Sequence, residues 1–379
     1  MLYLVEIIGL SIHFYGTIFD DKIYGRGTID DKGPTIASLY AMKYVMDNFK
    51  INKRVRLILG LDEENNWESI NYYRANEEHP DVSFSPDADF PCIYAEKEVI
   101  SSYLSSPCFI DNSKNLNIIG IDCNNNPLNV VPRFCSATIW VNHININSVF
   151  AFIKNLANND KSFDITLNIS NNQIQVNSYG KQAHAAHPDL GINAISNLIY
   201  ILDVTFKHFN CSNLFLEYVS KYIGNDFLGS LLGICFADFS GFLTLNIGYF
   251  ELKDNLLKLG LNIRVPVTFA SSDITSAFIG TIENLPITYE VHKIIPKLNL
   301  DSSNGLAVTL TRIFNDEYNS NYNPITIGGA TYARAFNNCI SFGPNFPNSK
   351  DMCHQTDEFI SIHNLLFCVK VYARAILEL

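Results

Sequence analysis

The stretch KGPTIASLYAMKYVMDNFKINKRVRLILGLDEE, from Lys32 to Glu64, contains the pattern on which the predicted fold depends. Apolar residues recur at helical spacing from Ile36 to Phe49, after a Gly33–Pro34 step that suits the first turn of a helix. The run VRLILGL, Val55 to Leu61, is apolar on both alternations, as in a strand that is covered on both faces. The stretch therefore predicts a helix followed by a buried strand.

The residues on either side extend this pattern. Polar residues 65–78 predict a surface helix and loop, and SFSPDADFPCIYAE (83–96) returns to the core. Helices are also expected around Gly305–Tyr318 and Asn364–Leu379. Alternating helices and strands in this order predict an α/β fold with a parallel or mixed sheet.

The middle of the chain has a different texture, from about residue 100 to residue 295. Alternating stretches such as FCSATIWVNHI, FDITLNI, NQIQVNSYG and LKLGLNIRVPV predict four strands, and one helical run covers Gly191 to Asn210. We therefore expect a discontinuous α/β domain formed by 1–98 and 296–379, with an α+β domain inserted at 99–295.

Composition excludes several classes of protein. Of the 379 residues 47% are hydrophobic and 17% charged, and the formal net charge is -11, which argues against disorder and against nucleic-acid binding. The nine cysteines are scattered without a CxxC pair, so neither a disulfide framework nor a cysteine-rich zinc site is expected. The start MLYLVEIIGL makes a poor signal peptide, and the apolar stretch Leu228–Phe242 is too short to span a bilayer. A cytoplasmic protein without a membrane partner is expected.

Acidic residues gather in three loops of the predicted α/β domain. Asp30 lies in GRGTIDDKG, Glu63 and Glu64 follow the predicted strand, and Asp87 lies in SPDADFP. Sites in open α/β sheets form where loops leave the carboxyl ends of strands, so these acids are expected to converge. Adjacent acids on their own usually lie in a solvated loop, but a carboxylate pair that ends a buried strand needs neutralising, commonly by a metal.

Histidines add further candidate ligands. His354 in MCHQTDE is the best placed for a metal, with Asp357 and Glu358 as residues that would orient it. His184 and His187 in GKQAHAAHP lie in a turn, where an ordinary loop histidine is an equal alternative for His184 and the favoured one for His187. Carboxylate and imidazole ligands favour zinc, with manganese or cobalt as alternatives, and a metal pair would activate water for amide hydrolysis.

Two arginines are candidates for gripping a substrate carboxylate. Arg264 lies in LNIRVP and Arg334 in IGGATYAR, and a guanidinium fork matches a carboxylate bidentately. A surface salt bridge is the alternative for each. Because IGGATYAR lacks the GxxxxGK[ST] pattern, nucleotide binding is not predicted.

Nine ordered motifs carry a resemblance to a known family: GRGTIDDKGPT, LDEEN, PDADFP, NVVP, GKQAHA, NIRVP, GGATYAR, FGPNFP and HQTDEF. From about Gly9 to the C-terminus the chain resembles the dinuclear-zinc aminoacylase/carboxypeptidase-like metallopeptidases, and within them the PepV-type (Xaa-His, carnosinase-like) dipeptidases. The resemblance implies a zinc-peptidase catalytic domain with a mixed sheet and an inserted ferredoxin-like lid domain.

The resemblance also implies roles for single residues. Asp30 would bridge two zinc ions, Glu64 and His354 would complete one metal site, and Asp87 would serve the other. Glu63 would be the general base.

In the lid, the resemblance implies that His184 stabilises the oxyanion while Asn129 and Arg264 contact the substrate. Arg334 resembles a further arginine on the substrate side.

The chain departs from the family pattern upstream of Asp30. The family carries a His-x-Asp-x-Val-Pro motif there, in which His binds metal, but the matching stretch MLYLVEI has Met1 and Tyr3 at those positions. His13 in SIHFYG is a weak substitute, and Ala330 replaces a family glycine. The expected function is a zinc-dependent dipeptidase acting on short peptides. The alternatives are an inactive remnant that has lost a metal ligand, and an amino-acid deacylase.

Overall fold

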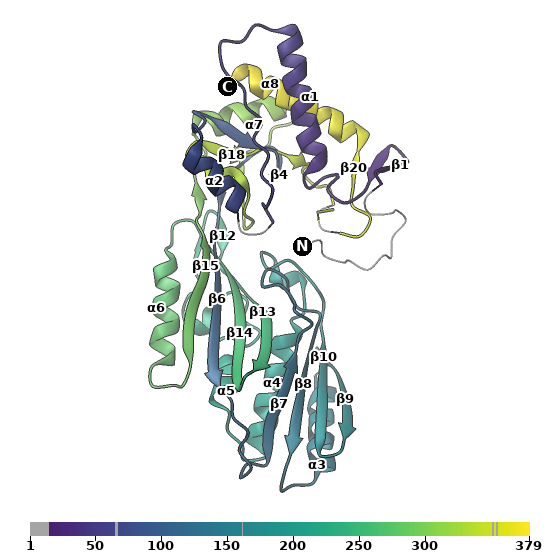
Figure 1. Cartoon of the computed structure of the whole chain (residues 1–379), viewed down its shortest axis with the longest axis vertical. Helices are drawn as coiled ribbons and strands as arrows, with labels where there is room; N and C mark the ends of the chain where they lie inside the picture. Colours follow the sequence, from purple (N-terminus) through teal and green to yellow (C-terminus); the bar gives the residue numbers. More distant parts are fainter. Residues whose placement is uncertain (1–14, 65–66, 161, 351, 354) are drawn as a thin grey trace. The chain divides into compact units, whose positions relative to one another are not determined.

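The structure is a computed structural model that describes residues 15–64, 67–160, 162–350, 352–353 and 355–379. The chain forms two compact units (Figure 1). Unit 1 combines Met1–Glu96 with Lys297–Leu379, and unit 2 is Lys97–Pro296. The predicted α/β class, with a second unit inserted into the first, is confirmed.

The main sheet of unit 1 is mixed, as predicted. Its strand order is β16-β5-β18-β3, and β17 also pairs with β5. The pairs β17–β5 and β18–β3 are parallel, whereas β16 and β18 run antiparallel to β5. The strands are β3 Ser83–Ser85, β5 Ile93–Glu96, β16 Leu298–Asn299, β17 Ile325–Ile327 and β18 Cys339–Ser341.

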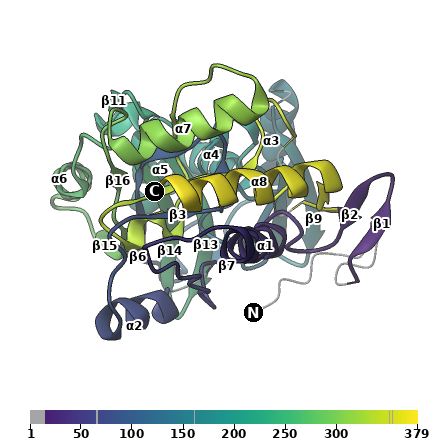
Figure 2. The ribbon, with the colours of Figure 1, turned by 90° about the horizontal axis from the view of Figure 1, so that it is seen from above.

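Within the described residues, unit 1 has four α-helices, and each was expected from the sequence. They are α1 Lys32–Asn48, α2 Glu68–Asn76, α7 Gly305–Tyr318 and α8 Ile362–Glu378. Helix α8 lies beside α1 and also contacts α7 (Figure 2). Their core is aromatic: Phe90 stacks on Phe314 with ring centroids 4.8 Å apart, and Phe342 and Tyr372 are fully buried against them.

The buried face of α1 differs from the predicted one. The apolar residues that recur at helical spacing are mostly exposed, with Tyr40 at 61% and Met46 at 72%. The buried side carries small residues instead, including Ala37 and Ala41. Small side chains let α8 approach closely, so packing selects the alanine face over the face with larger apolar residues.

The predicted strand Val55–Leu61 is wrong. The structure assigns no regular element to this run, and Leu59 and Leu61 are 59% and 89% exposed. An apolar run becomes a strand only when neighbouring backbones accept its hydrogen bonds. Among the described residues, no strand pairs with this segment.

Two small sheets in unit 1 support the loops that carry the candidate site. One has the order β1-β2-β20, formed by Thr17–Phe19, Lys22–Tyr24 and Phe359–Ser361. The other pairs β4 Ala88–Asp89 in parallel with β19 Pro344–Asn345. The first sheet pairs β2, just before the Asp30 loop, with β20, and the second begins directly after Asp87.

Unit 2 contains two four-stranded sheets. The first, ordered β7-β8-β10-β9, is contacted by α3 and α4, and α5 contacts α4. The second is ordered β13-β14-β6-β15, with α6 against β15. The four predicted stretches correspond to β8, β9, β10 and β14, whereas β6, β7, β13 and β15 and three helices were missed. The bounds are β6 Glu98–Pro107, β7 Leu116–Asp122, β8 Phe134–Val141, α3 Ile146–Asn159, β9 Asp164–Ser170, β10 Gln173–Tyr179, α4 Ala194–His208, α5 Leu214–Tyr222, β13 Thr244–Lys253, β14 Leu256–Val265, α6 Ser271–Ile282 and β15 Thr288–Ile295.

Short elements connect these parts. They are the 3-10 helices η1 Pro188–Leu190, η2 Ser230–Leu232 and η3 Tyr332–Ala335, and the hairpin of β11 Ala237–Asp238 with β12 Gly241–Phe242. No helix within the described ranges has the length and apolar character needed to cross a bilayer. All nine cysteines are free thiols.

Candidate functional site

The loop that carries Asp30 follows a tight path between β2 and α1. Gly25 and Gly27 have φ values of 152° and 84°, which side chains other than glycine rarely adopt. Lys32 N donates to Gly27 O at 2.7 Å, which closes the loop at the start of α1. The glycines therefore serve the conformation that the sequence indicated, and the Asp30–Asp31 peptide bond is cis.

Glu358 fixes the same loop from the other end of the chain. Its side chain is 2% exposed, and its Oε1 accepts from the backbone N–H groups of Ile29 at 3.0 Å and Asp30 at 3.3 Å. Its Oε2 accepts from Nη1 of Arg26 at 2.8 Å. The sequence suggested that Glu358 orients His354, but His354 lies outside the described residues. What the structure shows is contact with the Asp30 loop.

Asp31 is a residue that sequence reasoning passed over in favour of its neighbour Asp30. Burial raises the pKa of its carboxyl from 3.8 to about 10, and the charges of Asp87, Asp30 and Glu63 add to the shift. Its Oδ1 is buried without a hydrogen-bond partner among the described residues. The Asp-Asp pair was the available signal in the sequence.

Glu63 also lies close to several other negatively charged side chains. Burial raises the pKa of Glu63 well above 4.5, and Asp87, Glu64 and Asp30 raise it further. Its segment is held in place by Trp67, whose Nε1 donates to Glu63 O at 2.6 Å. The structure therefore brings acids from three separate loops of unit 1 within electrostatic range of one another.

The donor set of this acidic group fits a divalent cation. Carboxylate oxygens suit zinc, manganese and cobalt, and a cation would relieve the repulsion that raises the pKa values of Asp31 and Glu63. Across the described part of the chain, no group of three or more His, Cys, Asp or Glu side chains is arranged to hold a metal. The predicted ligand His354, and also Met1, Tyr3 and His13, lie outside that part.

Arg334 is buried in unit 1. Its Nε donates to Oε2 of Glu96, and neither side chain is exposed. Glu96 also accepts from the hydroxyl groups of Thr331 at 2.8 Å and Ser341 at 3.2 Å. Sequence reasoning missed Glu96, which forms a buried network that holds the 327–334 loop, and the substrate role of Arg334 stays a prediction.

In unit 2 the predicted residues Asn129, His184 and Arg264 gather around Ala185. The Asn129 carbonyl accepts from Ala185 N at 2.9 Å, beside the bridge that pairs Val130 with His184. Thr244 donates its hydroxyl to Ala185 O at 3.1 Å and is the cross-strand partner of Arg264. Three segments far apart in the sequence thus meet at one position.

The side chains of Asn129 and His184 are exposed, whereas Arg264 is only 4% exposed. Arg264 Nε donates to Asn262 Oδ1 at 2.8 Å, which fixes its guanidinium plane. Asn246, the cross-strand partner of Asn262, donates to the carbonyls of Leu128 at 2.9 Å and Val130 at 3.0 Å. The second sheet of unit 2 therefore anchors the loop that carries Asn129.

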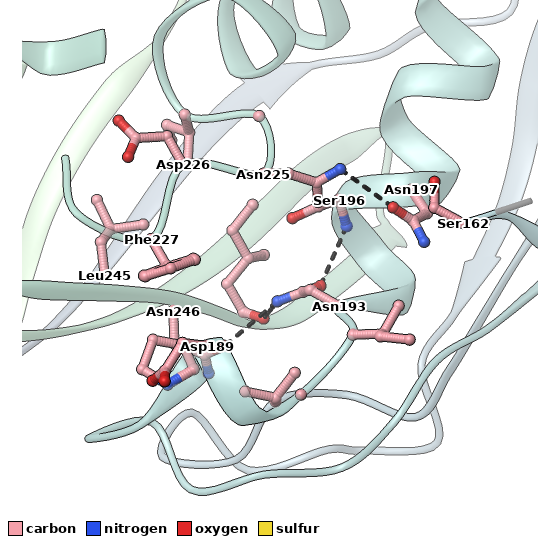
Figure 3. Close-up of a pocket in the computed structure, with 17 residues that line it drawn as sticks. Ser162, Asp189, Asn193, Ser196, Asn197, Asn225, Asp226, Phe227, Leu245 and Asn246 are labelled. Atoms are coloured by element: carbon pink, nitrogen blue, oxygen red, sulfur yellow. Dashed lines mark hydrogen bonds between the residues drawn. The ribbon is translucent and has the colours of Figure 1, made fainter. Parts of the chain in front are cut away.

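A pocket of about 220 Å³ opens beside the N-terminus of α4 in unit 2 (Figure 3). Asn193 caps α4 by accepting from Ser196 N at 3.1 Å and donates to Asn246 Oδ1 at 3.2 Å. Asn225 donates to Asn197 Oδ1 at 3.1 Å. The residues that line this pocket include none of the predicted site residues.

Comparison with known proteins identifies the family. The model of peptidase family M20/M25/M40 matches residues 8–378. The Bacillus subtilis (strain 168) protein named "Putative dipeptidase YtjP" is 36% identical over 97% of this chain and 78% of its own length. The Staphylococcus aureus (strain bovine RF122 / ET3-1) protein named "Putative dipeptidase SAB1611c" is 30% identical over the same shares.

A solved structure shares the fold. The crystal structure of human carnosine dipeptidase 1 superposes with a TM-score of 0.55 at 12% identity, covering 98% of this chain and 75% of that chain. The mixed α/β fold matches that of family structures with a catalytic and a lid domain. The chain belongs to peptidase family M20/M25/M40.

Proposed function

We propose that this protein is a metal-dependent dipeptidase of the PepV-type branch that hydrolyses short peptides. The observation that carries the proposal is the convergence of Asp30, Asp31, Glu63 and Asp87 in unit 1, where their charges raise the pKa values of Asp31 and Glu63. A relative that is 36% identical carries the name of a dipeptidase, which supports the choice of substrate.

Four residues would hold the metal. Asp30 would serve both zinc positions, Glu64 and His354 would complete one, and Asp87 would serve the other, with manganese or cobalt as alternatives to zinc. The charge of the acidic group supports a cation at this place. When bound, such a metal polarises the scissile carbonyl and lowers the pKa of water.

Glu63 is the proposed general base. It takes the proton from the attacking water and then delivers it to the leaving amine. Burial raises the pKa of its carboxyl, which brings its proton affinity closer to that required for both transfers near neutral pH. The hydrogen bond from Trp67 to the Glu63 carbonyl fixes the backbone from which this side chain extends.

Unit 2 is proposed to supply the residues that hold the substrate. Ala186 N donates to Nδ1 of His184 at 3.4 Å, so a neutral imidazole carries its proton on Nε2, where it can donate to an oxyanion. Asn129 and Arg264 would bind the peptide, with the Arg264 guanidinium directed at a carboxylate. In this assignment unit 1 is the catalytic domain and unit 2 is the lid. We also propose that the protein is cytoplasmic.

A hydrolysis assay with metal analysis tests this function. The purified full chain is expected to contain zinc and to cleave a dipeptide faster than an N-acetylated amino acid. Glu63→Gln should lower kcat by roughly 10²–10⁴-fold while metal stays bound. Glu77→Gln, at an exposed position after α2, is the matched control.

Three outcomes contradict the proposal. Protein with neither metal nor turnover would be an inactive family member. Faster cleavage of the acetylated amino acid would make it a deacylase. Unchanged turnover in the Glu63→Gln variant would remove the general base from the mechanism.

A further inference from the structure

Two loops from opposite ends of the chain are cross-linked next to Asp30. Residues 25–30 and 355–358 share five hydrogen bonds, four of which involve Glu358. Gly25 N donates to the Glu358 carbonyl at 2.9 Å, and Arg26 Nη2 donates to the Gln355 carbonyl at 3.3 Å. The proposed ligand Asp30 lies in the first loop, and the second directly follows the proposed ligand His354 in sequence.

The Glu358 carboxylate divides its two oxygens between backbone and side chain. Oε1 accepts from Ile29 N and Asp30 N, and Oε2 accepts from Arg26. Because Glu358 is 2% exposed, its charge is removed from water, and hydrogen bonds to an ionised acceptor are stronger than neutral ones. This contact fixes the backbone from which the Asp30 side chain extends.

Arg26 is needed for charge balance. A Glu358 carboxylate beside Asp30 and Asp31 adds a negative charge to a region in which acidic side chains already repel one another. The guanidinium of Arg26, 25% exposed at the rim, pairs with that charge. The pair therefore lets a strong acceptor hold the Asp30 backbone without raising the net charge of the acidic group.

We propose that Arg26 and Glu358 are positioning residues that preset the Asp30 loop for metal binding, an inference that rests on the proposed function. Neither residue acts on the substrate. Their contribution is to hold the backbone of Ile29 and Asp30 in one conformation before a metal arrives. Loss of comparable supporting hydrogen bonds around a metal site commonly lowers metal affinity by roughly 10–100-fold.

The test uses one variant on each side of the pair. Glu358→Gln keeps an oxygen for the backbone N–H groups but places an amide donor against the Arg26 donors. Arg26→Lys keeps the charge and removes the fork, at a position exposed enough for the chain to fold. Glu317→Gln is the matched control. Glu317 lies on α7, outside both loops, is 14% exposed, and accepts from Arg374 of α8 at 2.8 Å.

Three measurements separate positioning from simple stabilisation. They are the zinc dissociation constant by competition with a chromophoric chelator, the melting temperature in chelator and in saturating zinc, and amide exchange of residues 25–32 in the metal-free chain. We expect Glu358→Gln and Arg26→Lys to bind zinc roughly 10–100-fold more weakly, to gain less melting temperature from zinc, and to exchange faster. Glu317→Gln should leave the zinc dissociation constant, the gain in melting temperature from zinc and the exchange of residues 25–32 unchanged.

Other results would overturn either the positioning role or the proposed function. If the wild type binds zinc and both variants bind it equally well, the positioning role is overturned while the proposed function stands. A melting temperature that falls equally with and without zinc has the same meaning, because the residues then only stabilise the fold. If the wild type binds no metal, the proposed function fails first. Unchanged exchange at 25–32 in the variants would then overturn the loop-holding role as well.

Discussion

Arg334 and Glu96 form an ion pair from which solvent is excluded on both sides. Glu96 lies close enough to Glu63 for its charge to raise the pKa of the proposed general base. The guanidinium of Arg334 offsets that charge, and its Nη2 also donates to the Gly329 carbonyl. The pair thus connects the 327–334 loop to the edge of the acidic group.

Breaking this pair should destabilise the chain strongly. Arg334→Met leaves the Glu96 carboxylate buried with only neutral donors from Thr331 and Ser341, and removal of one partner from a buried pair costs about 3–5 kcal/mol. Urea unfolding measures the loss. Adding Glu96→Gln should restore part of it, and a single variant within about 0.5 kcal/mol of the wild type, as for surface changes, would contradict the prediction.

The metal-free chain should lose stability as the pH rises. The Asp31 carboxyl keeps its proton up to about pH 10 in the folded chain, whereas the unfolded chain releases it near 3.8. Between these values the unfolded state binds fewer protons, so rising pH favours unfolding. The melting temperature in chelator should therefore fall from about pH 5 to about pH 9.

Asp31→Asn should flatten this pH dependence, because it removes the titrating group. Asp47→Asn, at an exposed residue paired with Lys43 on α1, is the control and should keep the wild-type slope. Identical slopes for the wild type and Asp31→Asn would show that Asp31 does not titrate in this way.

Metal removal should lower the melting temperature. A cation that binds the folded state alone stabilises it by about 2.7 kcal/mol at a free concentration 100 times its dissociation constant. Calorimetry before and after treatment with chelator, and again after adding zinc, measures the change. Asp30→Asn should abolish most of the gain, and equal melting temperatures in all three states would argue against a metal in unit 1.

Thr244→Val tests the junction around Ala185 in unit 2. The change removes the hydroxyl that donates to Ala185 O and should cost about 1 kcal/mol of stability, together with a fall in dipeptide turnover as the His184 loop loosens. Thr205→Val is the matched control, because its buried hydroxyl donates to Ile201 O within α4. Equal turnover in the two variants would mean that the junction does not position His184.

Local sequence patterns predicted the loop positions of the acids, because their neighbours in sequence mark them. Glycines around Asp30 and a proline before Asp87 give each acid a loop setting, and the structure places these loops together. Three helices could also be predicted, because apolar residues recur at helical spacing over several turns of α1, α7 and α8.

Features that depend on distant partners were not predictable in this way. Residues 55–61 have the composition of a strand, but pairing decides whether such a run becomes one. Glu96 and Arg334 are 238 positions apart, and nothing near either residue in sequence specifies the other. The choice between the two apolar faces of α1 likewise depends on how closely α8 approaches.

The hydrogen bonds between residues 25–30 and Glu358 bear on the order of events during synthesis. Arg26 and Glu358 are separated by 332 positions, and α8 follows only after Glu358. Glu358 can therefore fix the Asp30 loop only after the 332 positions that follow Arg26 have been synthesised. Unit 2 is complete in sequence well before then. The inserted unit can therefore fold while the Asp30 loop still lacks its Glu358 partner.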